Sequence, residues 1–225
     1  MKDENNAFLV IDYKTGDYEN RRIRKLQIEV FDKNILCQDC DNRILGRYYE
    51  AYAKTVFYGA EHETDIKPQC KNYKNPDDNS EYSICTNFDY KKIKNFLLSL
   101  LWRSSITDQS FFDQINLGNK HNERLRHILY ENIETSEKEY PILITSFLRT
   151  TNTFKSTILK PYKAKHDGLV SYIFFIDGLQ YIFFVNSVNH KLPNKLEKFL
   201  LNKNQIFINH FRDGMELNIL KQFLD

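Results

Sequence analysis

The sequence is poor in glycine and proline, with 7 glycines and 5 prolines among its 225 residues. Disordered chains and flexible linkers are usually rich in such residues and poor in bulky hydrophobic ones. Here hydrophobic residues make up 41% of the chain and aromatic residues 14%. The composition therefore excludes a largely disordered chain and predicts one large domain or two small ones.

Long hydrophobic runs and a strong charge of one sign are also absent. The richest apolar stretch, "SYIFFIDGLQYIFFVNS", is interrupted by Asp177 and Gly178 and is too short to cross a bilayer. The polar start "MKDENNA" lacks the hydrophobic segment of a signal peptide. The 32 basic and 30 acidic residues nearly cancel, so any nucleic-acid contact would depend on a local patch. We therefore expect a cytoplasmic protein without membrane contact.

Hydrophobic periodicity predicts an α+β fold. Residues 7–13, "AFLVIDY", predict a first strand, and residues 24–30 predict a second, because Leu26, Ile28 and Val30 have the two-residue period of a strand. Together they predict an N-terminal hairpin. Apolar residues at helical spacing predict a helix that starts near Asp41 or Asn42 and stops at Gly59. Further helices are predicted in the middle of the chain, over residues 90–105 with Asp89 as N-cap, 108–115 and 120–133.

The C-terminal part predicts an antiparallel sheet with flanking helices. Strands are expected over residues 141–149, 156–162, 171–176, 179–185 and 205–211. Asp177-Gly178 favours a type I′ turn and therefore a hairpin, which we expect at the centre of the sheet because both of its strands are apolar on both faces. Helices are predicted over residues 193–202 and 216–224.

The segment 61–88 is polar and contains two prolines. It is predicted to be a long excursion between an N-terminal unit, residues 1–60, and a helical and antiparallel-sheet domain, residues 89–225. A single domain overall is the alternative.

The four cysteines offer a metal site. Cys37 and Cys40 in "ILCQDCDN" have the spacing of half a zinc site, which Cys70 and Cys85 would complete. Cys37 and Cys40 could instead form a redox pair, or all four could be reduced thiols, as is usual in the cytoplasm. In the simplest interpretation, Cys37 and Cys40 are reduced and packed.

Two stretches, "FDKNILCQDCDNRILGRYYEAYAKTVFYG" and "DYKKIKNFLLSLLWRSSIT", carry a resemblance. With their LC-x-x-C-D, YE-x-YA and LWR motifs they resemble a group of uncharacterised bacterial proteins related to zinc-bound HNH endonucleases. The resemblance implies bound zinc and a place among bacterial defence genes. Members of the group open with a second Cys-x-x-Cys and a Ser-His motif, whereas no Cys or His precedes Cys37 in this sequence.

The candidate catalytic residues, and the candidate contacts to a partner or to nucleic acid, are single residues that do not form a known motif. HNH chemistry needs a His base beside a divalent metal, and His166, His190 and His210 are the candidates for that base. Each has the alternative role of a polar residue at a strand end. Contacts to a partner or to nucleic acid are predicted at four basic residues: Arg21, Arg22, Arg24 and Arg103.

These observations favour a binding role over catalysis, because no phosphate-binding loop and no hydrolase signature occurs in the sequence. We expect a non-catalytic bacterial protein that binds a partner protein or nucleic acid, as an accessory component of an anti-phage defence system. The alternative is a divergent HNH-like, metal-dependent nuclease with a structural zinc.

Overall fold

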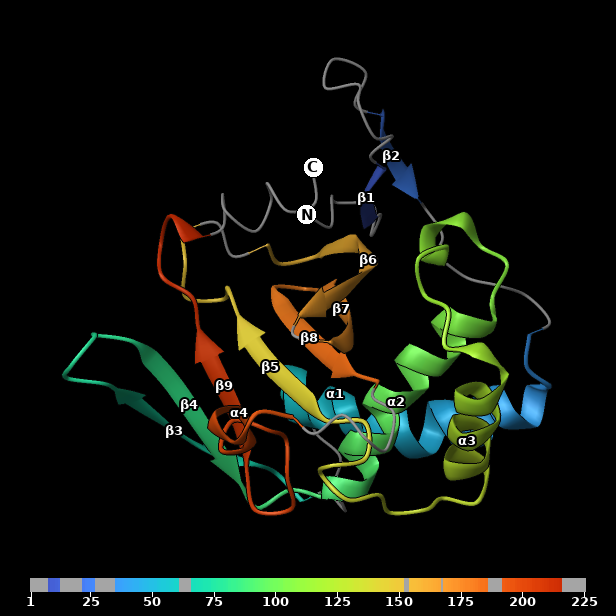
Figure 1. The fold of residues 1–225 in the computed structure, drawn as a ribbon, viewed down its shortest axis with the longest axis horizontal. Coiled ribbons are helices and arrows are strands. Elements are labelled where there is room, and N and C mark those ends of the chain that lie inside the picture. Colours follow the sequence, from blue (N-terminus) through green and yellow to red (C-terminus); the bar gives the residue numbers. More distant parts are fainter. Residues whose placement is uncertain are drawn as a thin grey trace.

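The computed structural model describes residues 8–12, 22–26, 35–60, 66–151, 154–166, 168–185 and 192–215. All strands in this part of the chain belong to one nine-stranded mixed sheet, in the order β2-β1-β6-β7-β8-β5-β9-β4-β3. Helices from the middle of the chain pack against the sheet (Figure 1). The predicted α+β class is confirmed.

The first two strands form the predicted N-terminal hairpin. β1 (Phe8–Asp12) pairs antiparallel with β2 (Arg22–Leu26). β1 also pairs in parallel with β6 (Thr157–His166), so this hairpin extends the sheet on one side.

The centre of the sheet is the predicted hairpin of β7 (Leu169–Ile176) and β8 (Leu179–Phe184). Asp177 and Gly178 between them both have positive φ, 52° and 77°, as a type I′ turn requires. Most side chains of both strands are buried, which confirms the central position expected from their apolar sequences.

On the other side of the centre, β5 (Ile142–Ser146) pairs with β8 and, in parallel, with β9 (Ile206–His210). β4 (Glu81–Thr86) follows β9, and β3 (Gln69–Lys74) ends the sheet. The segment predicted as a long polar excursion therefore contributes two strands to the sheet, β3 and β4, which were not predicted. The strand period was missed because all six side chains of β3 are exposed, so no apolar alternation marks it.

The helices follow the predicted order with changed lengths. η1 (Asp39–Glu50) is wound as a π-helix and continues directly into α1 (Ala51–Tyr58), which ends at Gly59 with φ 68°. α2 (Tyr90–Ile106) begins where predicted, because the Asp89 carboxylate accepts a hydrogen bond from the Lys92 N–H. α3 spans Gly118–Tyr130.

Three helix predictions were wrong in their extent. The first helix begins after Gln38, and not at Asp41 or Asn42. Residues 108–115 form only the 3₁₀ turn η2 (Ser110–Phe112), and residues 193–202 form only the short helix α4 (Asn194–Glu197). The helix predicted over 216–224 lies outside the described residues.

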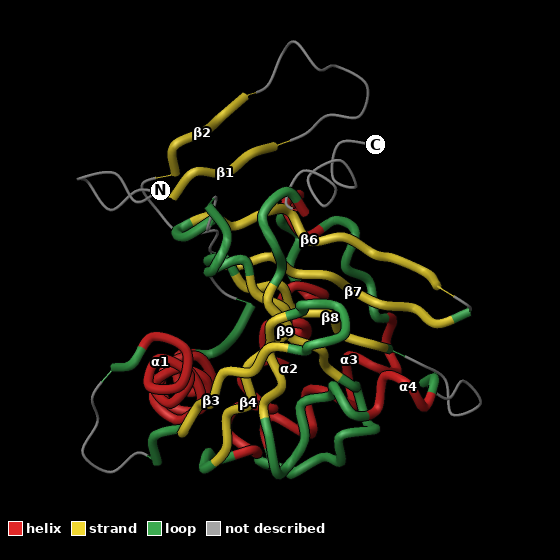
Figure 2. Tube along the Cα trace, turned by 90° about the vertical axis from the view of Figure 1, so that its left-hand side faces the viewer, coloured by secondary structure: helices red, strands yellow, loops and turns green. Residues whose placement is uncertain are grey.

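The main core lies between the helices and one face of the sheet. Buried side chains of η1, α1, α2 and α3 pack there with those of β5, β7, β8 and β9. Trp102, at 9% exposure, belongs to this core. In Figure 2 the strands lie between α1 on one side and α4 on the other. Within the described ranges, no helix is both long and apolar enough to span a bilayer.

Candidate functional site

The Cys37–Cys40 turn lies at the start of the η1–α1 helix. Cys37 directly precedes the helix and is exposed, whereas Cys40 lies in its first turn and is partly buried. The backbone N–H of Cys40 points to the Cys37 sulfur at 3.4 Å. The interpretation of two packed cysteines is therefore wrong for Cys37.

The four-cysteine zinc site is not assembled in the structure. Cys70 and Cys85 are directly opposite each other in the β3–β4 ladder and form a disulfide. The expectation that all cysteines are reduced thiols is thus corrected for this pair. In the described parts of the chain, no group of three or more His, Cys, Asp or Glu side chains could hold a metal ion. Cys37 and Cys40 remain as two sulfurs without further ligands among these residues.

His210 ends β9 and joins a polar network rather than a metal site. Its Nε2 lies 2.7 Å from the Ser83 hydroxyl. Arg149 donates hydrogen bonds to Ser83, to Asn72 and to the Glu81 carboxylate. Burial, together with the charge of Arg149, lowers the pKa of His210 to about 4. An imidazole with this pKa is a weak base at neutral pH, so the network serves chiefly to tie β3, β4 and β9 together.

The other two histidine candidates cannot be placed in a site. His190 lies outside the described residues, and so does the side chain of His166, whose backbone ends β6.

The predicted basic contacts are distributed over different parts of the chain. Arg103 donates a hydrogen bond to Glu50 at 2.8 Å and thereby links α2 to η1. Arg22 and Arg24 lie on β2, but their side chains, like all of Arg21, are outside the described residues. The structure therefore brings together no described basic cluster from these four residues.

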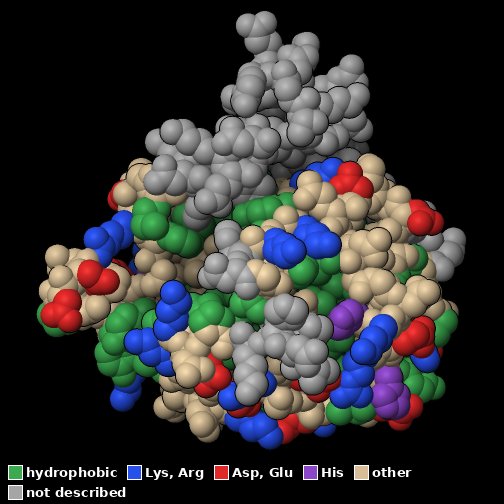
Figure 3. Space-filling view, in the orientation of Figure 1, with side chains coloured by type: hydrophobic (Ala, Val, Ile, Leu, Met, Phe, Trp, Pro, Cys, Tyr) green, Lys and Arg blue, Asp and Glu red, His purple; other side chains and the backbone are tan. Residues whose placement is uncertain are grey.

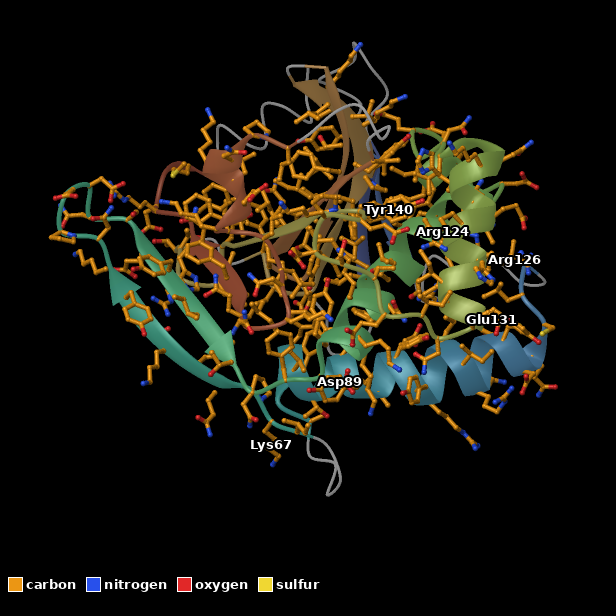
Figure 4. All side chains as sticks on the ribbon, turned by 60° about the horizontal axis from the view of Figure 1, so that its bottom comes forward. Lys67, Asp89, Arg124, Arg126, Glu131 and Tyr140 are labelled. Atoms are coloured by element: carbon orange, nitrogen blue, oxygen red, sulfur yellow. A yellow bond between two sulfur atoms is a disulfide. The ribbon has the colours of Figure 1, made fainter. Side chains whose placement is uncertain are left out.

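The open edge of the sheet at β3 is a feature that the sequence did not predict. β3 pairs with β4 on one side and with no described strand on the other. All six of its side chains are exposed, and two of them, Lys71 and Lys74, are basic. Figure 1 shows β3 and β4 as an arm at one end of the molecule, and Figure 4 shows Lys67 at its base.

The hydrogen-bond pattern shows which backbone groups of β3 face β4 and which face the opposite way. The Asn75 N–H donates to the Ser80 carbonyl at 2.8 Å, on the turn that joins β3 to β4. Hydrogen-bonded and non-hydrogen-bonded pairs alternate along an antiparallel ladder. The backbone groups of Gln69, Lys71 and Tyr73 therefore face β4. Those of the alternate residues point to the open edge: Cys70, Asn72 and Lys74.

An aromatic ladder crosses the face of the arm, on the side of the sheet where α4 lies. It consists of four rings, Tyr73, Tyr82, Phe207 and Phe199, with successive centroids 5.3, 5.1 and 4.8 Å apart. Tyr73 ends the ladder on β3 and is 41% exposed. Figure 3 shows hydrophobic and basic side chains next to one another over this part of the sheet.

Comparisons with protein families, curated proteins and solved structures found no match for this chain. The resemblance to HNH-related proteins therefore stays a prediction.

Proposed function

We propose that the protein is a binding protein that adds an extended segment of a partner protein to the open edge of its sheet at β3. The observation that carries the proposal is the exposure of all six residues of an edge strand whose outward backbone groups have no described strand to pair with. An extended peptide pairs with such an edge through main-chain hydrogen bonds. The role as an accessory component of an anti-phage defence system is part of the proposal and rests on the resemblance alone.

The arm is held in a form that suits this role. The Cys70–Cys85 disulfide fixes β3 to β4, and the Ser83–Asn72 hydrogen bond, at 2.7 Å, connects the same two strands. β4 in turn pairs with β9 along five residue pairs. A strand that is ordered before binding loses less conformational entropy when it binds, which favours affinity.

Charge indicates the kind of segment that would bind. β3 carries Lys71 and Lys74 and no acidic residue. An acidic segment would complement these charges, whereas β3 of a second copy would add two further lysines. The exposed Tyr73 ring would contact an apolar side chain of the segment. The proposed partner is therefore an acidic, extended peptide with alternating apolar residues, and not a second copy of this chain.

A proline at an outward-facing position tests the proposal. Lys74→Pro removes an N–H that points away from β4, so β3 itself is retained, since edge strands tolerate proline there. Lys74→Ala is the matched control, because it removes the same charge and keeps the N–H. The probe is a synthetic peptide of alternating Glu and Val. We expect binding by the wild type, weaker binding by Lys74→Ala and none by Lys74→Pro.

Three results would contradict the proposal. The first is equal binding of the peptide by Lys74→Pro and Lys74→Ala. The second is dimerisation of the wild type through β3, which would identify a second copy as the occupant. The third is preferential binding of oligothymidylate that is lost in Tyr73→Ala, because base stacking on the ladder would then explain the surface.

A further inference from the structure

Cys37 and Cys40 lie at the N-terminus of the η1–α1 helix, away from the β3 edge, and their position favours thiol chemistry. Cys37 lies at the start of a continuous helix built from the 12 residues of η1 and the 8 residues of α1. The N-terminus of a helix favours negative charge, because its first N–H groups have no partners within the helix. The thiolate form of an exposed cysteine is favoured at this position.

The two thiols have different environments. Cys37 is exposed and its sulfur accepts the hydrogen bond from the Cys40 N–H, whereas Cys40 is partly buried. Hydrogen bonds from the Cys40 side chain and backbone lower the pKa of Cys37. The same side-chain hydrogen bond raises the pKa of Cys40, as does its burial. One sulfur is thus prepared as a nucleophile, and its neighbour keeps its proton.

We propose that Cys37 and Cys40 form a thiol–disulfide exchange site that reduces a disulfide of another molecule. The Cys37 thiolate attacks one sulfur of the substrate disulfide, forms a mixed disulfide and releases the other sulfur as a thiolate. Cys40 then loses its proton to solvent or to the departing thiolate and attacks the Cys37 sulfur. The substrate leaves with both sulfurs reduced, and its two electrons come from the Cys37 and Cys40 thiols, which are oxidised to a disulfide.

A neighbouring ion pair adjusts this site. The Asp39 carboxylate lies beside Cys37, and its negative charge acts to raise the pKa of the thiol. Arg43 binds both oxygens of Asp39, at 2.6 and 2.7 Å, and so compensates that charge. Arg43 therefore supports the Cys37 thiolate through Asp39 and is a positioning residue rather than a catalytic one.

The disulfide of the same molecule is not the substrate. Cys70 and Cys85 join β3 to β4 at one end of the molecule, whereas η1 begins at the opposite end, beside α3 (Figure 1). The substrate must therefore be a separate molecule that carries a disulfide, either a protein or a small compound. The proposal does not depend on binding at β3, since the two sites share no residue.

Trapping the mixed disulfide tests the site. Reduced Cys40→Ser protein, treated with oxidised glutathione, should retain one glutathione on Cys37, since no second thiol can release it. The wild type under the same conditions should release glutathione and contain a Cys37–Cys40 disulfide, identified by peptide mass spectrometry. Cys37→Ser should form neither product. Insulin in place of oxidised glutathione tests a protein disulfide. A faster reaction with insulin would identify a protein as the substrate, and a faster reaction with glutathione would identify a small compound.

Alkylation by iodoacetamide provides a readout of the thiolate itself. In the wild type, Cys37 should react about tenfold faster than Cys40 at pH 7. The pH at which the alkylation rate of Cys37 is half-maximal, its midpoint, should lie below the ordinary thiol pKa of 9.0. Arg43→Ala should move that midpoint upward, whereas Arg126→Ala, which breaks an exposed ion pair elsewhere, should not.

Three results would overturn the proposal: no Cys37–Cys40 disulfide in the oxidised wild type, no trapped glutathione on Cys40→Ser, or equal alkylation rates for the two thiols. Zinc that co-purifies at one ion per two chains and protects both sulfurs would assign the turn to metal binding instead.

Discussion

The ammonium group of Lys94 donates a hydrogen bond to the backbone carbonyl of Tyr140 at 2.7 Å, at a site where the lysine has no exposed surface. Lys94 lies on α2, and Tyr140 lies in the segment before β5. Figure 4 shows Tyr140 near Arg124, which forms an ion pair with Glu139. Burial lowers the pKa of Lys94 from 10.5 to about 7.

This relationship predicts a pH dependence of stability. Between pH 7 and 10.5 the unfolded chain keeps the Lys94 proton that the folded chain has lost, so the free energy of unfolding should rise with pH in this range. Lys94→Met should remove this contribution and stabilise the fold at pH 7 by about 1–3 kcal/mol, because no charge is then buried. Urea unfolding at several pH values measures both effects.

The control for this prediction is Lys91→Met, which removes one charge at a partly exposed position of the same helix. Its unfolding free energy should follow the wild type at every pH. Parallel pH profiles for Lys94→Met and the wild type would contradict the assignment.

Truncation of Trp102 should destabilise the fold strongly. Trp102→Ala removes a large side chain from the main core, and such substitutions cost about 3–5 kcal/mol. Chemical denaturation measures this loss. Tyr130→Ala, at a position that is 59% exposed, should change stability by less than about 0.5 kcal/mol. An unchanged melting temperature in Trp102→Ala would show that the indole belongs to the surface.

Loss of the N-cap of α2 should lower the stability of the fold by less than truncation of Trp102 does. Asp89→Ala removes the acceptor of the Lys92 N–H and should cost about 1 kcal/mol. Asp89→Asn keeps an acceptor of similar geometry and should stay near the wild type. Equal losses in both variants would indicate that charge, rather than the hydrogen bond, stabilises this end of the helix.

The Cys70–Cys85 disulfide should stabilise the oxidised protein. It closes a loop with a sequence separation of 15 residues, for which chain entropy predicts about 3 kcal/mol. Cys70→Ala with Cys85→Ala should therefore unfold at lower denaturant concentration than the oxidised wild type. Reductant should shift the wild type in the same direction and leave the double variant unchanged. A wild type that is insensitive to reductant would argue against the disulfide.

Much of this fold could be predicted from local sequence. The β7–β8 hairpin follows from Asp177-Gly178 between two apolar runs, because the turn chemistry and the burial pattern agree. The start of α2 follows from Asp89 before an apolar stripe of helical period. At both places the local preference and the tertiary structure require the same residues.

The edge of the sheet could not be predicted in this way. β3 is held by pairing with β4 and by one disulfide, and its side chains contribute no buried face that would leave a periodic signal. The Cys70–Cys85 pair becomes recognisable only once the register of the two strands is known. The candidate functional site therefore depends on long-range pairing, whereas the sequence indicated only a polar segment there.

The most direct test of the proposed binding role is amide hydrogen exchange in β3 with and without the alternating Glu-Val peptide. We predict that the outward-facing amides of Asn72 and Lys74 become protected when the peptide binds, while the amides of Lys71 and Tyr73, already paired with β4, change little. A peptide with N-methylated backbone amides should bind poorly. Binding that leaves Asn72 and Lys74 as exchangeable as in the free protein would contradict strand addition at this edge.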